Sequence, residues 1–463
     1  MGALAPRPGC PRQPPSGWRR RRWSLPSSPL LPLLFCLGAG GAGADPAVGG
    51  LPGPYGVCGS ESPAALAAAS DSPALLDVAG SGLAAAGRWC RGRRVGSIGA
   101  APNMTYRPLG RTGLRVSGLS FGTMTFNVQG GESREAAVAR ATEILRVAIA
   151  GGINFFDNAE GYGGGESEEL FGQALASLFE AGVVRRTHLV ITTKLFFGAA
   201  GINAKGLSRK KLVEGVQGSL SRMGLTYVDV LLCHRRDPTT PIEETVRAMN
   251  YILDKGWAFY WGTSEWPAMD IATAIEIARE LKLVGPVVEQ TKFNLFFRER
   301  VEIELKPLIE RDGLGIMAFS PLAEGILAGR YTAADGPLPE GSRFESTYKA
   351  SKGKVNLTNK FEAQVEVARR LTPIAETEFA ASLAELSLAW ALGKKAVSSV
   401  LIGATSVEQL RQNLLAPSLA PLPEEVSRRM EAEAEVANVP LAWTVGHRER
   451  DISGAVKPRS PLP

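Results

Sequence analysis

The sequence predicts an α/β fold, a (β/α)8 TIM barrel with an N-terminal β-hairpin, preceded by a largely disordered N-terminal extension. Eight short β-rich runs alternate with amphipathic stretches between residues 104 and 440. The runs are apolar almost throughout, as in parallel strands that helices cover. No Gly-rich dinucleotide fingerprint follows them, which favours a closed barrel over a doubly wound sheet. We therefore expect three segments: the extension over 1–103, the barrel over 104–440 and a loose tail over 441–463.

The extension differs from the rest of the chain in its charge. Residues 1–103 contain ten Arg, no Lys and four acidic residues, whereas residues 104–463 carry 42 basic and 42 acidic side chains. A neutral body is a poor electrostatic match for nucleic acid, so we expect no nucleic-acid partner. Cys233 is the single Cys after residue 103, and the three His are widely spaced. No internal disulfide and no metal site are therefore expected in the barrel.

The extension also contains targeting-like patterns. Four Arg at 19–22 precede a short apolar run at 30–37, and Ala42-Gly43-Ala44 follows, as in a secretory-type signal. Residues 45–103 are Ala/Gly/Ser-rich and resemble an organellar transit segment, and the two together would suit a plastid reached through the secretory route. The alternative is a disordered tail, or translation that starts at Met104. Both interpretations stay open.

The elements of the barrel segment follow one another in a regular order. A hairpin is predicted over 106–110 and 114–117, turning at Thr112-Gly113. The eight strands are predicted over 119–125, 154–158, 189–194, 228–234, 259–263, 287–290, 315–320 and 398–403. Helical periodicity is found over 136–150, 208–223, 242–255, 271–281, 301–311 and 380–391. Thr240-Pro241-Ile242-Glu243 predicts a capping box with Pro at the first helical position, and 405–409 offers two registers of the same box.

Four stretches lie outside this alternation. Further helices are predicted over 359–370 and 424–437. Residues 333–358 contain several Gly and Pro and are predicted to form a long loop over one barrel face. Residues 161–165 are rich in Gly but lack the spacing of a phosphate-binding loop, so they are predicted to form a flexible loop.

Polar side chains stand at the C-terminal ends of three consecutive predicted strands, where barrel enzymes place their reactive groups. Asp157 follows the second strand, Lys194 ends the third and His234 ends the fourth, and Tyr162 comes five residues after Asp157. These residue types can reduce a carbonyl. Tyr donates the proton, and a nearby Lys ammonium lowers the Tyr pKa from its usual value of ~10. Asp157 would keep Lys194 charged, and His234 would hydrogen-bond the carbonyl oxygen.

Each of these four residues also has an ordinary structural explanation. A strand-end Asp often caps a helix, and a strand-end Lys is often solvated. A loop Tyr can simply pack its ring, and a His can be satisfied within a core. Because the four occur on three consecutive strands and point to one end, we favour a shared catalytic site.

These residues carry a resemblance to a known family. Asp157, Tyr162, Lys194 and His234, with Leu109-Gly110-x-x-Gly113-Leu114, are similar to the pattern of the aldo-keto reductase superfamily. Residues 191–194, 206–210, 241–249 and 257–264 closely resemble its branch of voltage-gated potassium channel β subunits, especially the plant-like members. The resemblance covers roughly residues 104–440.

The resemblance implies NADPH-dependent reduction of aldehydes and ketones to alcohols, by a cytoplasmic homotetramer attached to potassium channel α subunits. It also implies a cofactor site. Ser264 and Gln290 would contact the nicotinamide carboxamide, and Arg330 and Arg343 would lie near the adenosine phosphate, favouring NADPH over NADH. The helix start at 405–406 would offer free backbone N–H groups to phosphate. The remaining implied contacts are Thr123 and Asp157, Ser320, Pro321, Leu322, Ala323 and Gly325 along the pyrophosphate, and Gly403, Thr405, Gln409 and Asn413 at the adenine end.

The sequence departs from the family pattern in two informative places. His234 stands where animal channel subunits often have Asn, which suggests a more ordinary reductase. Glu265 stands where the family frequently has Arg, which weakens the phosphate contact expected there. Three functions therefore stay open: a carbonyl reductase resembling channel β subunits, a redox-sensing channel module with little turnover, and a glyceraldehyde-type reductase unrelated to channels.

Overall fold

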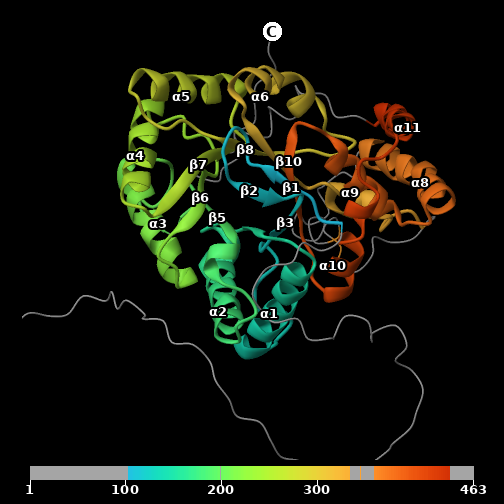
Figure 1. Ribbon diagram of the computed structural model, residues 1–463, viewed down its shortest axis with the longest axis horizontal. Coiled ribbons are helices and arrows are strands. Elements are labelled where there is room, and N and C mark those ends of the chain that lie inside the picture. Colours follow the sequence, from blue (N-terminus) through green and yellow to red (C-terminus); the bar gives the residue numbers. More distant parts are fainter. Residues whose placement is uncertain (1–102, 199, 334–341, 343–344, 346–358, 438–463) are drawn as a thin grey trace, which may run out of the picture. The chain divides into compact units, whose positions relative to one another are not determined.

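Eight strands pair side by side into a closed parallel barrel in the computed structural model (Figure 1). The model describes residues 103–198, 200–333, 342, 345 and 359–437. The strands are β3 (Leu119–Gly122), β4 (Phe155–Asp157), β5 (Val190–Leu195), β6 (Val228–Cys233), β7 (Ala258–Ser264), β8 (Val288–Lys292), β9 (Gly315–Phe319) and β10 (Val397–Ile402). Pairing of β10 with β3 closes the barrel. The predicted fold class and all eight predicted strands are confirmed, with ends that differ by a few residues.

Some predictions fall outside the described residues. They are the extension apart from Asn103, the C-terminal tail and most of the loop predicted over 333–358. The domain boundaries predicted from the sequence stay predictions.

The predicted hairpin closes the N-terminal end of the barrel. Strands β1 (Tyr106–Pro108) and β2 (Arg115–Ser117) pair antiparallel. Gly110, with φ +56°, lies so close to the barrel that a Cβ there would come within 2.5 Å of the Val287 carbonyl oxygen. A glycine is therefore required at this contact. The hairpin leaves the opposite, C-terminal end of the strands for the polar residues.

Helices surround the barrel, as the alternating pattern predicted (Figure 1). They are α1 (Arg134–Ala150), α2 (Glu166–Glu180), α3 (Arg209–Met223), α4 (Ile242–Asp254), α5 (Ala268–Glu280), α6 (Lys306–Asp312), α9 (Leu383–Gly393) and α10 (Val407–Asn413). The two additional predicted helices are α8 (Asn359–Phe379), which extends beyond its predicted end, and α11 (Glu424–Glu435). These two helices contact each other.

Two local predictions were wrong. The capping box at α4 does not form, because the Thr240 hydroxyl donates to Asp237 Oδ2 at 2.6 Å and Pro241 itself occupies the cap position. The helix predicted over 301–311 is divided into a π-helical turn, Arg300–Glu304, and α6. Pro307 lies in the first turn of α6, where its missing N–H is tolerated, but it cannot continue a preceding helix.

The core has two parts. Most buried apolar side chains lie between the barrel and its helices, among them Phe121, Trp261 and Trp390. A second cluster joins the hairpin residues Leu109 and Val116 to strand residues that include Phe155, Val230 and Met317. Apolar side chains thus fill much of the fold beside the hairpin, on the side away from the C-terminal ends of the strands.

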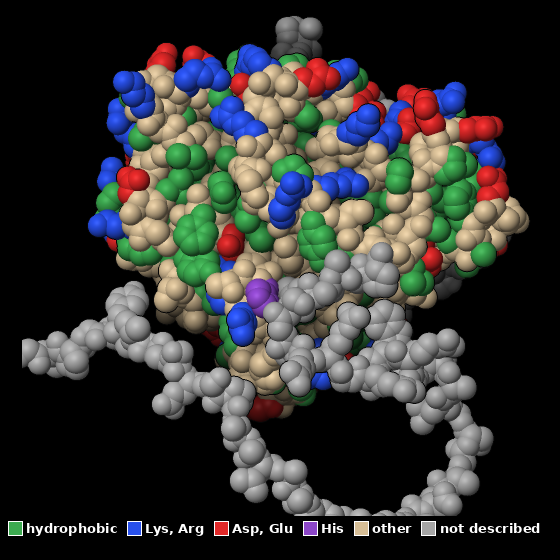
Figure 2. Space-filling view, viewed as in Figure 1, with side chains coloured by type: hydrophobic (Ala, Val, Ile, Leu, Met, Phe, Trp, Pro, Cys, Tyr) green, Lys and Arg blue, Asp and Glu red, His purple; other side chains and the backbone are tan. Residues whose placement is uncertain are grey.

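Basic and acidic side chains are interspersed on the face shown in Figure 2, without a large patch of one sign. Within the described ranges, no helix combines the length and apolar character needed to cross a membrane. Those residues also contain no group of three or more His, Cys, Asp or Glu placed to hold a metal ion.

Candidate active site

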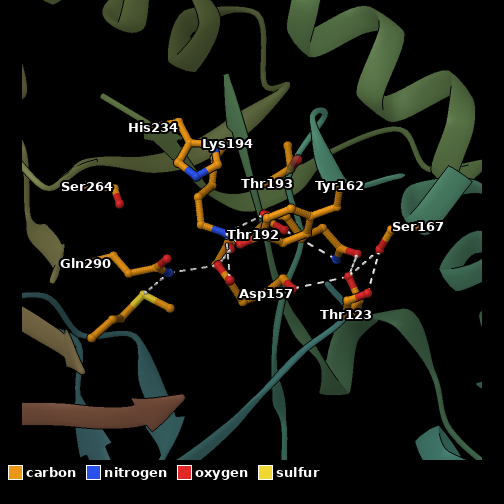
Figure 3. A network of polar contacts seen from close by, with 12 residues as sticks. Thr123, Asp157, Tyr162, Ser167, Thr192, Thr193, Lys194, His234, Ser264 and Gln290 are labelled. Carbon is orange, nitrogen blue, oxygen red and sulfur yellow. Dashed lines mark hydrogen bonds and ion pairs between the residues drawn. The ribbon is translucent and has the colours of Figure 1, made fainter. Parts of the chain in front are cut away.

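The predicted polar residues meet at the C-terminal end of the barrel. Asp157 ends β4, Lys194 lies near the end of β5 and His234 directly follows β6. These strands are neighbours in the barrel, and Tyr162 lies in the short connection from β4 to α2. Figure 3 shows the four side chains around one centre. The predicted convergence of Asp157, Tyr162, Lys194 and His234 is therefore observed.

Lys194 is the centre of the polar network. It is fully buried, and its Nζ lies 2.6 Å from Asp157 Oδ2, 2.7 Å from the Asn158 carbonyl oxygen and 2.9 Å from the Tyr162 hydroxyl. The three N–H donors of the ammonium thus have three acceptors. Burial alone would lower the pKa of Lys194, but the interactions with Asp157 and Tyr162 together outweigh burial and the net pKa is raised. Lys194 therefore stays charged.

Asp157 is held in place from two further sides. Its Oδ1 accepts hydrogen bonds from Thr192 Oγ1 at 2.7 Å and from Gln290 Nε2 at 2.9 Å. Sequence reasoning gave Thr192 no role. It lies two residues before Lys194 on the same strand, so the alternation of side chains along β5 could have placed both on one face. The carboxylate is therefore oriented towards Lys194 by β5 beside it and by β8 across the barrel.

Tyr162 begins a short 3-10 turn, Tyr162–Gly165, at the position where a flexible loop was predicted. Desolvation raises the pKa of the Tyr162 phenol above its usual value, although Lys194 acts in the opposite direction. The predicted lowering of the Tyr pKa was therefore wrong in its net direction, because burial outweighs the ammonium. The phenol keeps its proton near neutral pH and is a neutral donor.

His234 lies beside Tyr162, with ring centroids 6.0 Å apart and the rings nearly perpendicular. Burial, with the positive charges of Lys194 and Arg235, lowers the pKa of His234 well below its usual value. The imidazole is therefore neutral and offers one N–H donor and one acceptor. Its buried Nδ1 has no hydrogen-bond partner in the part of the chain that the structure describes.

Two residues near His234 were missed by the sequence reasoning. The Phe197 ring lies 5.0 Å from the His234 ring. Arg235 Nη1 lies 2.6 Å from the His234 carbonyl oxygen and 3.4 Å from Ser264 Oγ. Both residues follow strand ends, where hydrophobic periodicity gives no information about side-chain direction.

The residues implied for the nicotinamide end lie on the next two strands. Ser264 ends β7 and Gln290 lies in β8, and both are buried. Gln290 joins the polar network around Lys194 directly, through its hydrogen bond to Asp157. Thr123 lies after β3, where its buried hydroxyl is bonded to the Asn158 side chain and contacts Ser167.

The residues implied for the pyrophosphate form a tight turn after β9. Positive φ angles occur at Ser320, Ala323, Glu324 and Gly325, a geometry that turns backbone N–H groups towards a common centre in anion-binding turns. The Glu324 carboxylate lies in this turn but is paired with Lys292 Nζ at 2.9 Å. Pro321 and Leu322 complete the turn. Within the turn, the Ala323 N–H donates to the Ser320 carbonyl at 3.1 Å and the Gly325 N–H donates to the Leu322 carbonyl at 2.9 Å, so these two groups are already bonded.

Arg330 is an exposed residue just beyond this turn. Its backbone N–H donates to the Gly325 carbonyl at 3.2 Å, and a Cβ at Gly325 would lie 3.6 Å from Arg330 Cδ. The side chain of Arg330 therefore runs beside the turn. Arg343, its predicted companion, lies outside the described residues.

The residues implied for the adenine end lie between β10 and the end of α10. Gly403 has open space around it, and Asn413 is buried. The expectation of free N–H groups at 405–406 was wrong in part. Gln409 Oε1 accepts the Thr405 N–H at 3.0 Å, and Ser406 Oγ accepts the Gln409 N–H at 3.3 Å. Of the two predicted capping registers, the one that begins at Ser406 forms.

Taken together, the implied cofactor residues follow β7, β8, β9 and β10, which are successive neighbours in the barrel. These residues form an arc from Ser264 to Asn413 that would hold an extended dinucleotide. The described residues therefore fit a nicotinamide dinucleotide.

The barrel and the polar centre at the C-terminal end of its strands are the arrangement of a (β/α)8 enzyme. The Aldo/keto reductase family model matches residues 118–435, and the chain belongs to this family. "Probable voltage-gated potassium channel subunit beta" of Arabidopsis thaliana is 48% identical over 324 residues, which are 69% of this chain and 93% of that protein. The protein of the same name from Oryza sativa subsp. japonica is 47% identical over 331 residues, 70% of this chain and 95% of its own length.

Proposed function

We propose that this protein is an NADPH-dependent aldo-keto reductase that converts aldehydes and ketones to alcohols. The observation that carries the proposal is the hydrogen-bonded series from Asp157 through Lys194 to the Tyr162 hydroxyl, with distances of 2.6 Å and 2.9 Å. A neutral phenol beside a permanently charged ammonium is suited to donate a proton and to tolerate the negative charge that remains.

Each residue of the site would have a separate role in the reduction of the carbonyl. The chemistry expected of the bound cofactor is hydride donation to the carbonyl carbon. Tyr162 would donate its proton to the carbonyl oxygen, and Lys194 would stabilise the phenolate that this leaves. The neutral His234 would donate a hydrogen bond to the same oxygen, and Asp157 would hold Lys194 in place. Ser264 and Gln290 would orient the nicotinamide through its carboxamide.

Replacement of Tyr162 tests the proposal. In Tyr162→Phe, the ring remains but the proton donor is lost, so the rate of aldehyde reduction should fall by about 10² or more. NADPH binding should be retained, because no implied cofactor contact is removed. The measurement is NADPH oxidation with a panel of aldehydes and quinones, alongside NADPH affinity measured by fluorescence.

Tyr251→Phe is the matched control, because Tyr251 lies in α4 and its ring packs against Trp257. This variant should turn over like the wild type. Unchanged turnover in Tyr162→Phe would contradict the proposed role of the phenol as proton donor.

A second candidate function is that of a channel-auxiliary subunit that uses bound NADPH as a redox signal. The names of the two plant relatives favour it. Comparing single with multiple turnovers separates the candidates. Sustained turnover that depends on Tyr162 favours the reductase, whereas one slow oxidation with NADP⁺ retained favours the auxiliary subunit. Light scattering would test for the homotetramer, and co-purification with a potassium channel α subunit would test for the partner.

A further inference from the structure

Glu160 is a buried acidic residue between Asp157 and Tyr162, outside the catalytic network just described. Its backbone N–H donates to the Lys194 carbonyl at 3.2 Å. Its carboxylate turns towards the β5–α3 connection, where Oε1 accepts the N–H of Phe196 at 2.7 Å and the N–H of Gly198 at 3.1 Å. One side chain from the Tyr162 loop thus bonds the residues on both sides of Phe197.

The charge of Glu160 is compensated by Lys211, in the first turn of α3. Lys211 Nζ lies 2.5 Å from Glu160 Oε2, and both side chains are buried. A buried ion pair is weak evidence for a contribution to stability, because the cost of removing two charges from water offsets their attraction. The buried Glu160 carboxylate is better explained by its hydrogen bonds to the backbone of Phe196 and Gly198, which hold that segment in position.

The segment that Glu160 holds carries the Phe197 side chain. The ring packs against His234 at a centroid distance of 5.0 Å, yet Phe197 is 41% exposed. It is therefore a wall of the site and not a core residue. On its other side, a Cβ at Gly161 would lie 3.3 Å from Phe197 Cβ, so the Tyr162 loop and the Phe197 segment are in close contact.

We propose that Glu160 is a positioning residue that holds Phe197 against His234, and that this wall selects carbonyl substrates with a flat apolar group, such as aromatic aldehydes. The inference rests on the proposed carbonyl reduction. A planar aromatic group can stack on or meet the edge of the Phe197 ring, which favours it over a short aliphatic chain. Glu160 acts only through the segment that it holds.

Two double variants isolate the acceptor role of Glu160 from its charge. Both remove the ion pair through Lys211→Met, so neither leaves a buried unpaired charge. In Glu160→Gln/Lys211→Met, the amide oxygen can still accept the N–H groups of Phe196 and Gly198. In Glu160→Leu/Lys211→Met, that oxygen is absent and both N–H groups lose their acceptor. The full-length chain is used throughout.

The activity measurement is kcat/KM with NADPH for benzaldehyde and for propanal. The Gln/Met variant should keep the wild-type ratio of the two values within about threefold. The Leu/Met variant should lose about tenfold or more for benzaldehyde and much less for propanal, because misplacement of a positioning wall penalises the substrate that uses it. Both double variants are also made in a Phe197→Ala background. There the Leu/Met and Gln/Met variants should no longer differ in kcat/KM for benzaldehyde, since loss of the Phe197 ring and loss of the Glu160 acceptor remove the same interaction.

Hydrogen exchange of the amides at 196–198 provides a readout that does not depend on activity. These amides should exchange about tenfold faster in the Leu/Met variant than in the Gln/Met variant. Equal exchange in the two variants would overturn the holding role. If the Leu/Met variant lost kcat/KM equally for benzaldehyde and propanal, and this loss added to that of Phe197→Ala, selection by Phe197 would be overturned. The wild type could also show no turnover while the two variants still differ in exchange as expected. That result would reject the proposed reductase function and the substrate selection that rests on it. The role of Glu160 in holding the segment would stand.

Discussion

At the scale of single residues, burial decides the protonation of Tyr162 and His234 in the candidate active site. The ammonium of Lys194 lies 2.9 Å from the Tyr162 hydroxyl, yet the pKa of the phenol is raised because desolvation opposes the phenolate more strongly. His234 is affected in the opposite sense, since burial and nearby cations lower its pKa. Both groups are therefore neutral over the same wide range of pH.

This arrangement predicts a broad pH profile for carbonyl reduction. Reduction needs the protonated phenol, and its fraction falls as pH rises through the Tyr162 pKa. Because that pKa is raised above 10.0, kcat/KM should stay level from about pH 6 to about pH 9 and fall only at higher pH. Steady-state kinetics across this range, with NADPH saturating, are the measurement.

Lys194→Met provides the comparison for the pH profile. Lys194 lowers the pKa of Tyr162, so its loss should move any remaining alkaline limb to still higher pH, besides reducing the rate. If the wild-type profile of kcat/KM fell on the alkaline side with a midpoint of about pH 7, this would contradict a Tyr162 phenol whose pKa is raised by burial.

Arg330 should determine the preference between the two nicotinamide cofactors. Its side chain runs beside Gly325 of the turn after β9, and a guanidinium paired with a 2′-phosphate contributes a charge-assisted hydrogen bond. Arg330→Ala should weaken NADPH binding by about tenfold or more and NADH binding by less than about twofold. Titration of both cofactors by fluorescence is the test, with the exposed Arg428→Ala on α11 as control. Equal weakening for the two cofactors would remove Arg330 from the phosphate site.

At the scale of elements, close contacts between helices limit which residues are allowed. Gly172 in α2 lies against the end of α3, where a Cβ would come within 2.5 Å of the Met223 carbonyl oxygen. That neighbour is backbone and cannot turn aside. Gly218 in α3 has as its nearest neighbour Nη1 of Arg222, at 3.3 Å, and the guanidinium of Arg222 is paired with Glu168. The two glycines therefore differ in what surrounds them although both are helical.

These two positions give a matched pair of stability predictions. Gly172→Ala should lower the free energy of unfolding by about 1–3 kcal/mol, because the added methyl separates α2 from α3. Gly218→Ala should change it by less than about 1 kcal/mol, since the backbone entropy that alanine saves in a helix is offset by the displacement of Arg222. Urea unfolding followed by circular dichroism measures both. A stabilised Gly172→Ala protein would contradict the packing described for α2 and α3.

At the scale of the molecule, closure of the barrel makes its two most distant strands neighbours. Strand β10 pairs with β3 through Val400 with Leu119 and Ile402 with Phe121. Every strand of the barrel thus lies between residues 119 and 402, with hydrogen-bonded neighbours on both sides. Closure leaves no open edge in this sheet.

We therefore expect the chain from Met104 onwards to fold as the full-length chain does. Its thermal midpoint should agree within about 2 °C, because the barrel is complete without residues 1–103. A chain that ends at Lys394 lacks β10 and should not unfold cooperatively. Differential scanning calorimetry of the three proteins tests this expectation. A midpoint lower by about 5 °C or more in the first truncation would mean that the extension stabilises the barrel.

The sequence was sufficient for the architecture because buried parallel strands impose a simple pattern. Eight apolar runs separated by helical periodicity are hard to reconcile with anything except a barrel of eight units. The same order of strands placed Asp157, Lys194 and His234 at one end, since parallel strands that follow one another bring their ends together. Family resemblance then indicated Ser264, Gln290 and the turn after β9.

Only the tertiary structure decided the features that depend on competition between neighbours. Thr240 could cap α4, but Asp237 is a nearer partner for its hydroxyl. The direction of the Tyr162 pKa depended on how much burial opposes Lys194, which spacing along the chain does not encode. The sequence also assigned no role to Phe197 or Glu160. Their roles depend on contacts between two loops, and loop residues carry no periodicity from which side-chain direction could be derived.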